Sequence, residues 1–191
     1  MTYWPAYLGV FFLGAFTWSF MEYMIHRFLG HDRRFRPNRF AAEHLPHHSK
    51  GNYFAPTWKK VGAAIVVFPI AFAPVYLLAG LDWGLLYATG LVVGYSFYEA
   101  LHRLEHIHAG FGAYGRWARR HHFYHHFGNP AMNHGVTSPL WDIIFRTYHK
   151  PETVIAVPDK LKMRWLTDSE TGQVHTRLRP FYSLRGQNPA A

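Results

Sequence analysis

The sequence predicts an all-α protein anchored in a membrane by about three helical spans, with a helical cap at one end of them. Three segments without a charged side chain support this fold class: 1 to 21, 61 to 81 and 83 to 98. Twenty-one helical residues, as in the middle segment, rise about 31 Å, which matches the hydrocarbon core of a bilayer. Two such segments joined only by Asp82 are not expected in the core of a 191-residue soluble chain. We therefore predict an integral membrane protein.

The spans are expected in order along the chain. The first runs over about 3 to 29, which is longer than a bilayer requires, so its last turns are expected to leave the membrane with Gly30 as the C-terminal cap. Residues 31 to 60 are expected as a basic loop or short helices. The second and third spans, 61 to 81 and 83 to about 107, are joined by a tight turn. Trp and Tyr near the segment ends fit an interfacial belt.

The formal charge of +9 is distributed unevenly. Seven of the 20 Lys and Arg lie between 30 and 60 and twelve follow residue 101, whereas the turn at 79 to 84 has none. The positive-inside rule therefore predicts cytoplasmic basic loops and an external turn, in a bacterial inner membrane or an ER-type membrane. With membrane spans present, this charge does not indicate a nucleic-acid partner. Cysteine is absent, which excludes a disulfide framework and thiolate metal ligands.

Histidines are grouped at spacings suited to metal binding. On a helix, imidazoles at i and i+3 or i+4 project from one face, so one metal ion reaches both. The spacing H-x-x-H-H occurs at 44 to 48 and again at 122 to 126, and "HRLEH" begins at 102. A pair five residues apart, at 26 and 31, converges only if the chain turns at Gly30. The ten candidate ligands, five for each of two metal ions, are His26, His31, His44, His47, His48, His102, His106, His122, His125 and His126.

The remaining histidines and the nearby carboxylates have weaker signals. His108, His149 and His175 are predicted to be structural, and the register of the first box favours His122 over His121. Imidazole suits iron, zinc, copper and nickel alike. Candidate hydrogen-bond acceptors behind the ligands, which would fix the imidazole tautomers, are Glu22, Glu43, Glu99, Glu105 and Asp142. Ordinary ion pairs with the abundant Arg explain these carboxylates equally well.

The four boxes "HRFLGH", "HLPHH", "HRLEH" and "HFYHH", in this order, resemble the fatty acid hydroxylase/sterol desaturase superfamily of membrane di-iron oxygenases. The similarity covers roughly 20 to 150, and "NHGVTSPLWDIIFRTY" resembles the stretch after the last box in fatty acid hydroxylase members. The resemblance implies two iron ions held by the ten histidines in a cytoplasmic cap, O2 as co-substrate, and hydroxylation or desaturation of a lipid. It also makes Asn133 and His134 candidates to contact a metal, directly or through water.

Two features depart from the superfamily pattern. Three spans are expected rather than the four that are common, and no electron-carrier domain is recognised. Electrons are therefore expected from a separate donor, a ferredoxin or small cytochrome with its reductase. Arg116, Arg119 and Arg120 suit the docking of such an acidic carrier, although lipid headgroups or solvent explain them equally well. We divide the chain into a membrane-embedded catalytic domain, 1 to 150, and a polar cytoplasmic tail, 151 to 191, of unassigned role.

The preferred function is O2-dependent di-iron hydroxylation of a lipid from the bilayer, most simply a fatty-acyl chain. Zinc is expected to replace iron easily in recombinant protein, because it binds such sites more tightly. Alternatives within the superfamily are a carotenoid ring hydroxylase and a sterol oxidase or desaturase. An alternative of another class is a membrane metal transporter or metal-storage protein. Transport would place the ligands near the bilayer midplane on broken helices, whereas here they are expected at helix ends and in loops.

Overall fold

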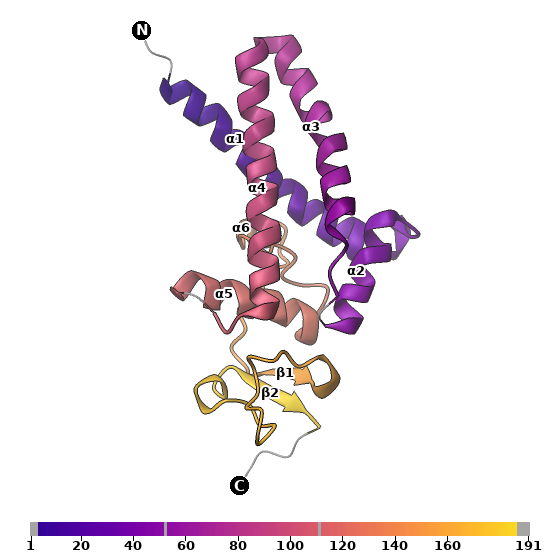
Figure 1. Cartoon of the computed structure of the whole chain (residues 1–191), viewed down its shortest axis with the longest axis vertical. Coiled ribbons are helices and arrows are strands. Elements are labelled where there is room, and N and C mark those ends of the chain that lie inside the picture. Colours follow the sequence, from indigo (N-terminus) through magenta and orange to yellow (C-terminus); the bar gives the residue numbers. More distant parts are fainter. Residues whose placement is uncertain (1–3, 52, 111, 187–191) are drawn as a thin grey trace.

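The computed structural model describes residues 4–51, 53–110 and 112–186, most of them in helices (Figure 1). The elements follow one another as α1 (Trp4–Met24), the π-helix η1 (Ile25–His31), η2 (Arg33–Phe35), α2 (Arg39–Lys50), α3 (Thr57–Ala79), α4 (Leu81–Ile107), α5 (Gly112–Phe123), the π-helix η3 (Tyr124–Gly128), α6 (Leu140–Ile144), β1 (Ile155–Pro158), η4 (Asp159–Leu161), η5 (Thr176–Leu178) and β2 (Tyr182–Arg185). The helices α1, α3 and α4 form one end of the molecule, and the strands form the other.

Helix α4 is the centre of the anchor, since both α1 and α3 pack along it (Figure 1). Helices α3 and α4 form an antiparallel hairpin that turns at Gly80. Helix α1 crosses α4 at very close range: a Cβ atom at Gly14 would lie 2.1 Å from the Tyr87 carbonyl oxygen, and one at Gly90 would lie 1.9 Å from that of Phe11. Small residues at such crossings let membrane helices approach backbone to backbone.

The outer surface of the anchor is apolar. Helix α3 has no buried residue, and its Leu77 and Leu78 are 79% and 89% exposed. By length and composition, the helical stretches Trp4–His31 and Thr57–Ala79 can each cross a membrane. The third predicted span is present as α4, which is 27 residues long and packs between them. Exposed apolar helices with internally satisfied backbones suit a lipid environment, so this part is the membrane anchor predicted from the sequence.

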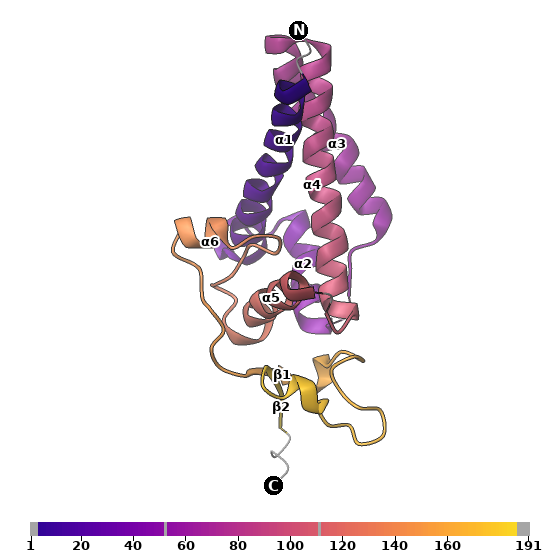
Figure 2. The same ribbon diagram turned by 90° about the vertical axis from the view of Figure 1, so that its left-hand side faces the viewer.

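The cap lies where α1 and α4 end, and contains η1, α2, α5, η3 and α6 (Figure 2). Local capping holds α2 in place. The Asn38 side chain accepts a hydrogen bond from the backbone N–H of Ala41 (2.8 Å) and donates one to the Leu29 carbonyl (2.8 Å). This interaction caps the helix N-terminus and ties α2 to η1. Gly51, with φ of 66°, follows the last residue of α2.

The structure confirms the predominantly helical fold, and it adds a small sheet in the segment beyond residue 150, which was expected only as a polar tail. Strands β1 and β2 pair in parallel, with Ile155 opposite Tyr182 and Val157 opposite Leu184. A small apolar core joins these strands to the end of α5 and to η3; it contains Phe123, Phe127, Ile155, Val157, Met163, Leu166, Val174, Leu178, Tyr182 and Leu184. Apart from the short apolar run at 154 to 157, the apolar residues of this core are scattered among polar ones in irregular segments, so no extended periodic pattern reveals it.

The fold leads to a prediction about topology. The turn at Gly80 and the π-helix ending at Gly128 lie at opposite ends of α4 (Figure 1). Reporter fusions after Gly80 and after Gly128 should therefore report opposite sides of the membrane, with the Gly128 fusion in the cytoplasm. Both reporters on the same side would contradict the hairpin.

Candidate metal centre

A π-helix brings the first two candidate histidines together. His26 and His31 both lie in η1, and their ring centroids are 5.2 Å apart. The i to i+5 hydrogen bonding of a π-helix places residues five apart on nearly the same face, whereas an α-helix would separate them by about 140°. The predicted cap at Gly30 is therefore wrong, because the helix continues through it. A Cβ at Gly30 would lie 2.9 Å from the His44 ring, so glycine admits that ring to the site.

The two H-x-x-H-H boxes each divide their side chains between two groups. In α2, His44 and His48 contribute to one group and His47 to the other. At the junction of α5 and η3, His122 and His126 join the group of His47, whereas His125 joins the group of His44. Each box therefore supplies an i, i+4 pair to one group and its remaining histidine to the other.

Two further pairs complete the groups. The first group contains His26, His31, His44, His48 and His125, and the second contains His47, His102, His106, His122 and His126. Within each group, one ring nitrogen of every histidine lies within 4.8 Å of all the others. All ten histidines selected from their spacing are brought together by the fold, and each five-nitrogen group can hold a metal ion.

The nitrogen-to-nitrogen distances fit ligands of a shared cation. The Nε2 atom of His31 lies 2.8 Å from that of His44 and 2.9 Å from that of His125. Two nitrogens bound at right angles to one metal at about 2.1 Å are separated by about 3.0 Å. A neutral imidazole has a single N–H or a single lone pair at this position, so it does not satisfy two such partners by hydrogen bonding.

The second group has the same geometry. The Nε2 atoms of His102 and His47 are 2.9 Å apart, and those of His106 and His122 are 3.1 Å apart. The Nε2 atom of His126 is buried and has no hydrogen-bond partner among the described residues. The same is true of the Nε2 atom of His26 in the first group. Leaving a buried polar atom unpaired costs about 1–3 kcal/mol, which coordination of a metal would offset.

Backbone carbonyls hold three of these rings from behind. The Nδ1–H groups of His26, His47 and His125 donate to the carbonyls of His134 (2.5 Å), Tyr53 (2.7 Å) and Met132 (2.7 Å), respectively. A proton fixed on Nδ1 leaves the Nε2 lone pair directed into the group, as metal ligation requires. The loop around 132 to 134 thus orients one histidine from η1 and one from η3.

Burial keeps the imidazoles outside the membrane spans neutral. It lowers the pKa of His47 to about 4 and that of His48 to about 2, and it holds the pKa of His122 and His125 well below the ordinary 6.5. At neutral pH these side chains are therefore unprotonated, the state that binds metal.

Most of the candidate carboxylates hold the protein framework rather than the imidazoles. Glu43 pairs with Lys59 and accepts from Tyr53 (2.5 Å), and Glu99 pairs with Lys60. These two carboxylates therefore form ordinary ion pairs, with Lys rather than with the Arg that the sequence analysis considered. The carboxylate of Glu105 is buried and has no hydrogen-bond partner among the described residues.

Glu22 and Asp142 instead shape the loop that follows the second box. Glu22 accepts from the backbone N–H groups of Val136 (2.5 Å) and Thr137 (3.0 Å). Asp142 accepts from those of His134 and Gly135, both at 2.8 Å. Burial alone would raise the pKa of Asp142, but hydrogen bonds from the His121 and His134 side chains, the Gly135 N–H group and the Thr147 hydroxyl lower it. The two carboxylates therefore support the ligands through the loop.

Asn133 does not contact the histidine groups. It adopts φ of 57°, and its amide bonds to the backbone of His149 (2.8 Å and 2.7 Å) and of His121 (3.3 Å). The His134 ring lies closer to the site, with its centroid 5.2 Å from that of His125. Sequence reasoning selected both residues together, but only the second borders the first group.

The histidines left out of the ligand set lie elsewhere. The His121 Nε2 atom is 3.3 Å from the Asp142 carboxylate. His149 stacks on Tyr124 with ring centroids 4.1 Å apart. His108 follows the end of α4, and His175 precedes η5. None of these four belongs to either five-histidine group.

A helical membrane anchor whose cap holds two such groups defines a membrane protein with a histidine-rich site that could hold metal ions. Residues 11–147 match the model of the fatty acid hydroxylase family. The chain therefore belongs to the fatty acid hydroxylase family, as its four boxes predicted.

Relatives of known function support this assignment. The chain is 31% identical over 153 residues to the ceramide very long chain fatty acid hydroxylase SCS7 of Saccharomyces cerevisiae, covering 77% of this chain and 40% of that protein. It is 31% identical over 151 residues to human fatty acid 2-hydroxylase, covering 73% and 39% of the two chains. The chain thus spans about two fifths of the length of these relatives.

The fold agrees with a solved structure as well. A structure described as full-length scs7p, with only the hydroxylase domain visible, superposes with a TM-score of 0.61 at 29% identity. The match covers 82% of this chain and 61% of the other.

Replacing a histidine in either group should remove metal from the purified protein. His125→Ala deletes one nitrogen of the first group, so we expect the metal content to fall by at least half relative to the unaltered protein. His175→Ala is the matched control and should leave the content unchanged, because His175 lies outside both groups. The number of metal ions per chain is measured by mass spectrometry of the metals, with the protein quantified by amino-acid analysis. Equal loss in both variants would contradict the ligand set.

The buried neutral histidines also predict a pH dependence for the metal-free protein. Their pKa values are lower in the folded than in the unfolded chain, so the unfolded chain binds more protons below pH 6.5. The unfolding free energy should therefore be constant above about pH 7 and fall below about pH 6.5, by up to about 1.4 kcal/mol per pH unit for each such histidine. Thermal unfolding in detergent between pH 8 and pH 5 tests this, and His48→Gln should reduce the slope. A melting temperature independent of pH over this range is the opposing result.

Proposed function

We propose that this chain is a membrane-bound hydroxylase of a lipid, with a fatty-acyl chain as the substrate, and that it uses O2 and electrons from a separate carrier. The observation that carries the proposal is the pair of five-histidine groups at the membrane-facing cap, in a chain of the fatty acid hydroxylase family. In such a hydroxylation, one C–H bond reacts with one O2, two electrons and two protons. The products are one C–OH group and one water.

The ten histidines would hold two iron ions, one in each group. Bound iron would supply the oxidant for an unactivated C–H bond, a reaction that no amino-acid side chain performs. The all-nitrogen donor set fits iron but also fits zinc, and the affinity order favours zinc over Fe(II). Recombinant protein that carries zinc is therefore expected to be inactive.

The residues of the chain would orient the ligands and restrict access to the site. The carbonyls of His134, Tyr53 and Met132 fix ring orientation, and the burial of the imidazoles limits water. Phe54 lies against the second group, with its ring centroid 5.3 Å from that of His47 and 5.6 Å from that of His106. We assign it to the wall against which the substrate carbon is held.

The location of the groups supports a lipid substrate. His102 and His106 stand on the last turns of α4, the helix that also forms the membrane anchor. Two turns of helix separate Gly94, at the crossing with α1, from His102. An acyl chain in the bilayer would reach the site from the anchor, while O2 and electrons arrive from the cap. The charge distribution supports a cap that faces the cytoplasm, in a bacterial inner membrane or an ER-type membrane.

Two of the relatives favour an acyl substrate over the alternatives. The human relative is named a fatty acid 2-hydroxylase and the yeast one a ceramide very long chain fatty acid hydroxylase. Both names support hydroxylation of an acyl chain rather than oxidation of a carotenoid ring or a sterol, and the name of the human relative supports carbon 2 as the position. The ligands lie at helix ends and in the cap, which does not suit a metal transporter.

Lipid analysis would test the substrate. Lipids of cells with and without the chain, compared by mass spectrometry after hydrolysis, should differ by 2-hydroxy fatty acids. The variant His102→Ala should abolish them, whereas His175→Ala should not. An oxidised carotenoid or sterol as the new product, with unchanged acyl chains, would instead support the alternatives.

Dependence on a carrier can be tested by reconstitution. Reduced nicotinamide delivers electrons in pairs, whereas iron accepts them singly, so splitting requires a flavin and delivery requires a haem or iron–sulfur protein. With iron, the candidate lipid and NAD(P)H, we expect product only after addition of a ferredoxin or small cytochrome and its reductase. Product at full rate without a carrier would overturn this part of the proposal.

A further inference from the structure

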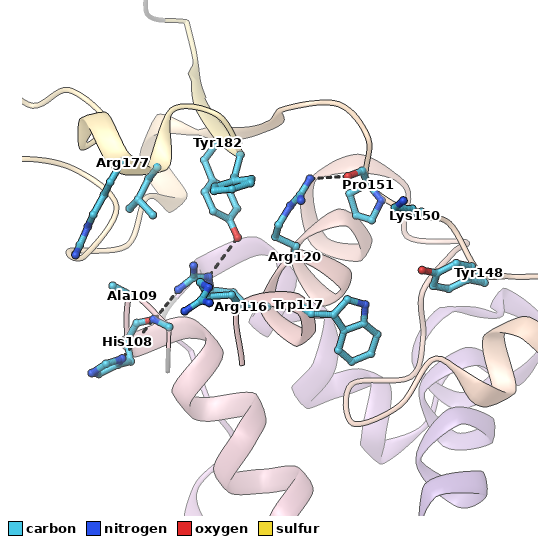
Figure 3. Close-up of a pocket in the computed structure, with 14 residues that line it drawn as sticks. His108, Ala109, Arg116, Trp117, Arg120, Tyr148, Lys150, Pro151, Arg177 and Tyr182 are labelled. Atoms are coloured by element: carbon cyan, nitrogen blue, oxygen red, sulfur yellow. Dashed lines mark hydrogen bonds between the residues drawn. The ribbon is translucent and has the colours of Figure 1, made fainter. Parts of the chain in front are cut away.

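A cavity of about 650 Å³ lies between α5 and the C-terminal unit, on the side of the cap that faces away from the membrane helices (Figure 3). The ten histidines do not line it, and the proposed reaction does not use it. Its walls come from the end of α4, from α5, from the segment around residue 150 and from the C-terminal unit. It can be formed only because residues 151–186 fold against α5.

The lining carries positive charge on three of these four walls, all except the end of α4. The cations are Arg116, Arg119, Arg120, Lys150 and Arg177, and no carboxylate is among the lining residues. Three of them come from α5, whereas Arg177 projects from η5 on the opposite wall (Figure 3). Cations that converge from separate elements on a concave surface create a strong field for an anion.

Arg119 is the most informative of these cations. It was expected on an exposed docking face but is only 2% exposed. Its guanidinium donates to the Tyr182 hydroxyl (3.2 Å) and the His108 carbonyl (3.0 Å) and lies 4.2 Å from the centre of the Trp165 ring. These partners are neutral, and no carboxylate of the described residues, the buried Glu105 included, forms an ion pair with it. A buried charge is costly without an opposite charge.

Arg120 also has unused hydrogen-bonding capacity. Its guanidinium donates to the Pro151 carbonyl (2.5 Å) and covers the Phe181 ring at 4.8 Å. Its Nε atom is buried without a partner among the described residues. The planar fork of a guanidinium matches the oxygens of a phosphate group, and such bonds are stronger than those between neutral groups.

We propose that this cavity binds a small molecule whose phosphate group meets the arginines and whose apolar or aromatic part rests on Trp117 and Phe181. The volume lies within the range of small-molecule sites, about 300–1,000 Å³, and exceeds the needs of a lone phosphate ion. A soluble phosphate ester and the headgroup of a phospholipid share this chemistry. Trp117 stacks on His121 at 5.2 Å, which belongs to neither histidine group, so binding does not require the metals.

Calorimetric titration of the purified full chain in detergent tests the proposal, with three probes: adenosine diphosphate, inorganic pyrophosphate and dioctanoyl phosphatidic acid. The titrations are done at about 150 mM salt, where exposed charges are screened beyond about 8 Å. We expect saturable binding of at least one probe, near one per chain. Arg116→Gln with Arg177→Gln should weaken it by at least about tenfold. Arg164→Gln, an exposed residue of the same unit that does not line the cavity, is the control.

The outcomes separate the sources. Binding of the diphosphate or pyrophosphate indicates a soluble ester, and binding of phosphatidic acid alone indicates a headgroup; both support the site. No saturable binding of any probe, or equal weakening by Arg164→Gln, overturns it. If no probe binds but the double variant loses affinity for a reduced ferredoxin, the surface docks an acidic protein and the proposal is wrong. Unchanged metal content and melting temperature in the double variant exclude misfolding as the cause.

Discussion

The cap depends on one electrostatic constraint: ring nitrogens that carry lone pairs converge on two points inside the protein. Without a cation at each point, neighbouring Nε2 atoms lie about 3 Å apart in a buried setting, and the single N–H or lone pair of each imidazole cannot satisfy all of its neighbours. Such an arrangement is unfavourable on its own, and a metal ion at each point would relieve it. The free energy of metal binding would then become free energy of folding for the cap. The anchor and the C-terminal unit together hold the elements that carry the rings.

The two groups are built on the same plan. Each takes an i, i+4 pair from one H-x-x-H-H box, a single histidine from the other box, and a pair from a long helix. The helix pair is His102 and His106 on α4 for one group, and His26 and His31 on η1 for the other. Because α4 continues as a regular helix, its pair is four apart; η1 is a π-helix, so its pair is five apart. The local helix type therefore determines the spacing in sequence at which two histidines of one helix reach the same group.

The membrane helices and the ten candidate histidines were predicted from the sequence because each depends largely on local periodicity, whereas the division of the histidines into two groups came only from the fold. Uncharged segments of bilayer length predict spans, and i, i+4 spacing predicts a shared face. The π-helices were not readable, since nothing in "IHRFLGH" distinguishes five-residue from four-residue hydrogen bonding. The C-terminal unit was also missed, because its core is assembled from short segments that lie far apart in the chain, such as those of Val157 and Leu184. The burial of Arg119 follows from that unit and could not be foreseen without it.

X-ray absorption spectroscopy at the edge of the bound metal tests the central claim most directly, because it reports the ligand shell without requiring activity. The account predicts about five nitrogen ligands per metal at about 2.0–2.2 Å, with the outer-shell scattering of imidazole rings and two metals per chain. A shell dominated by carboxylate oxygen, or a single metal with four or fewer imidazoles, would contradict the assignment of all ten histidines to two sites.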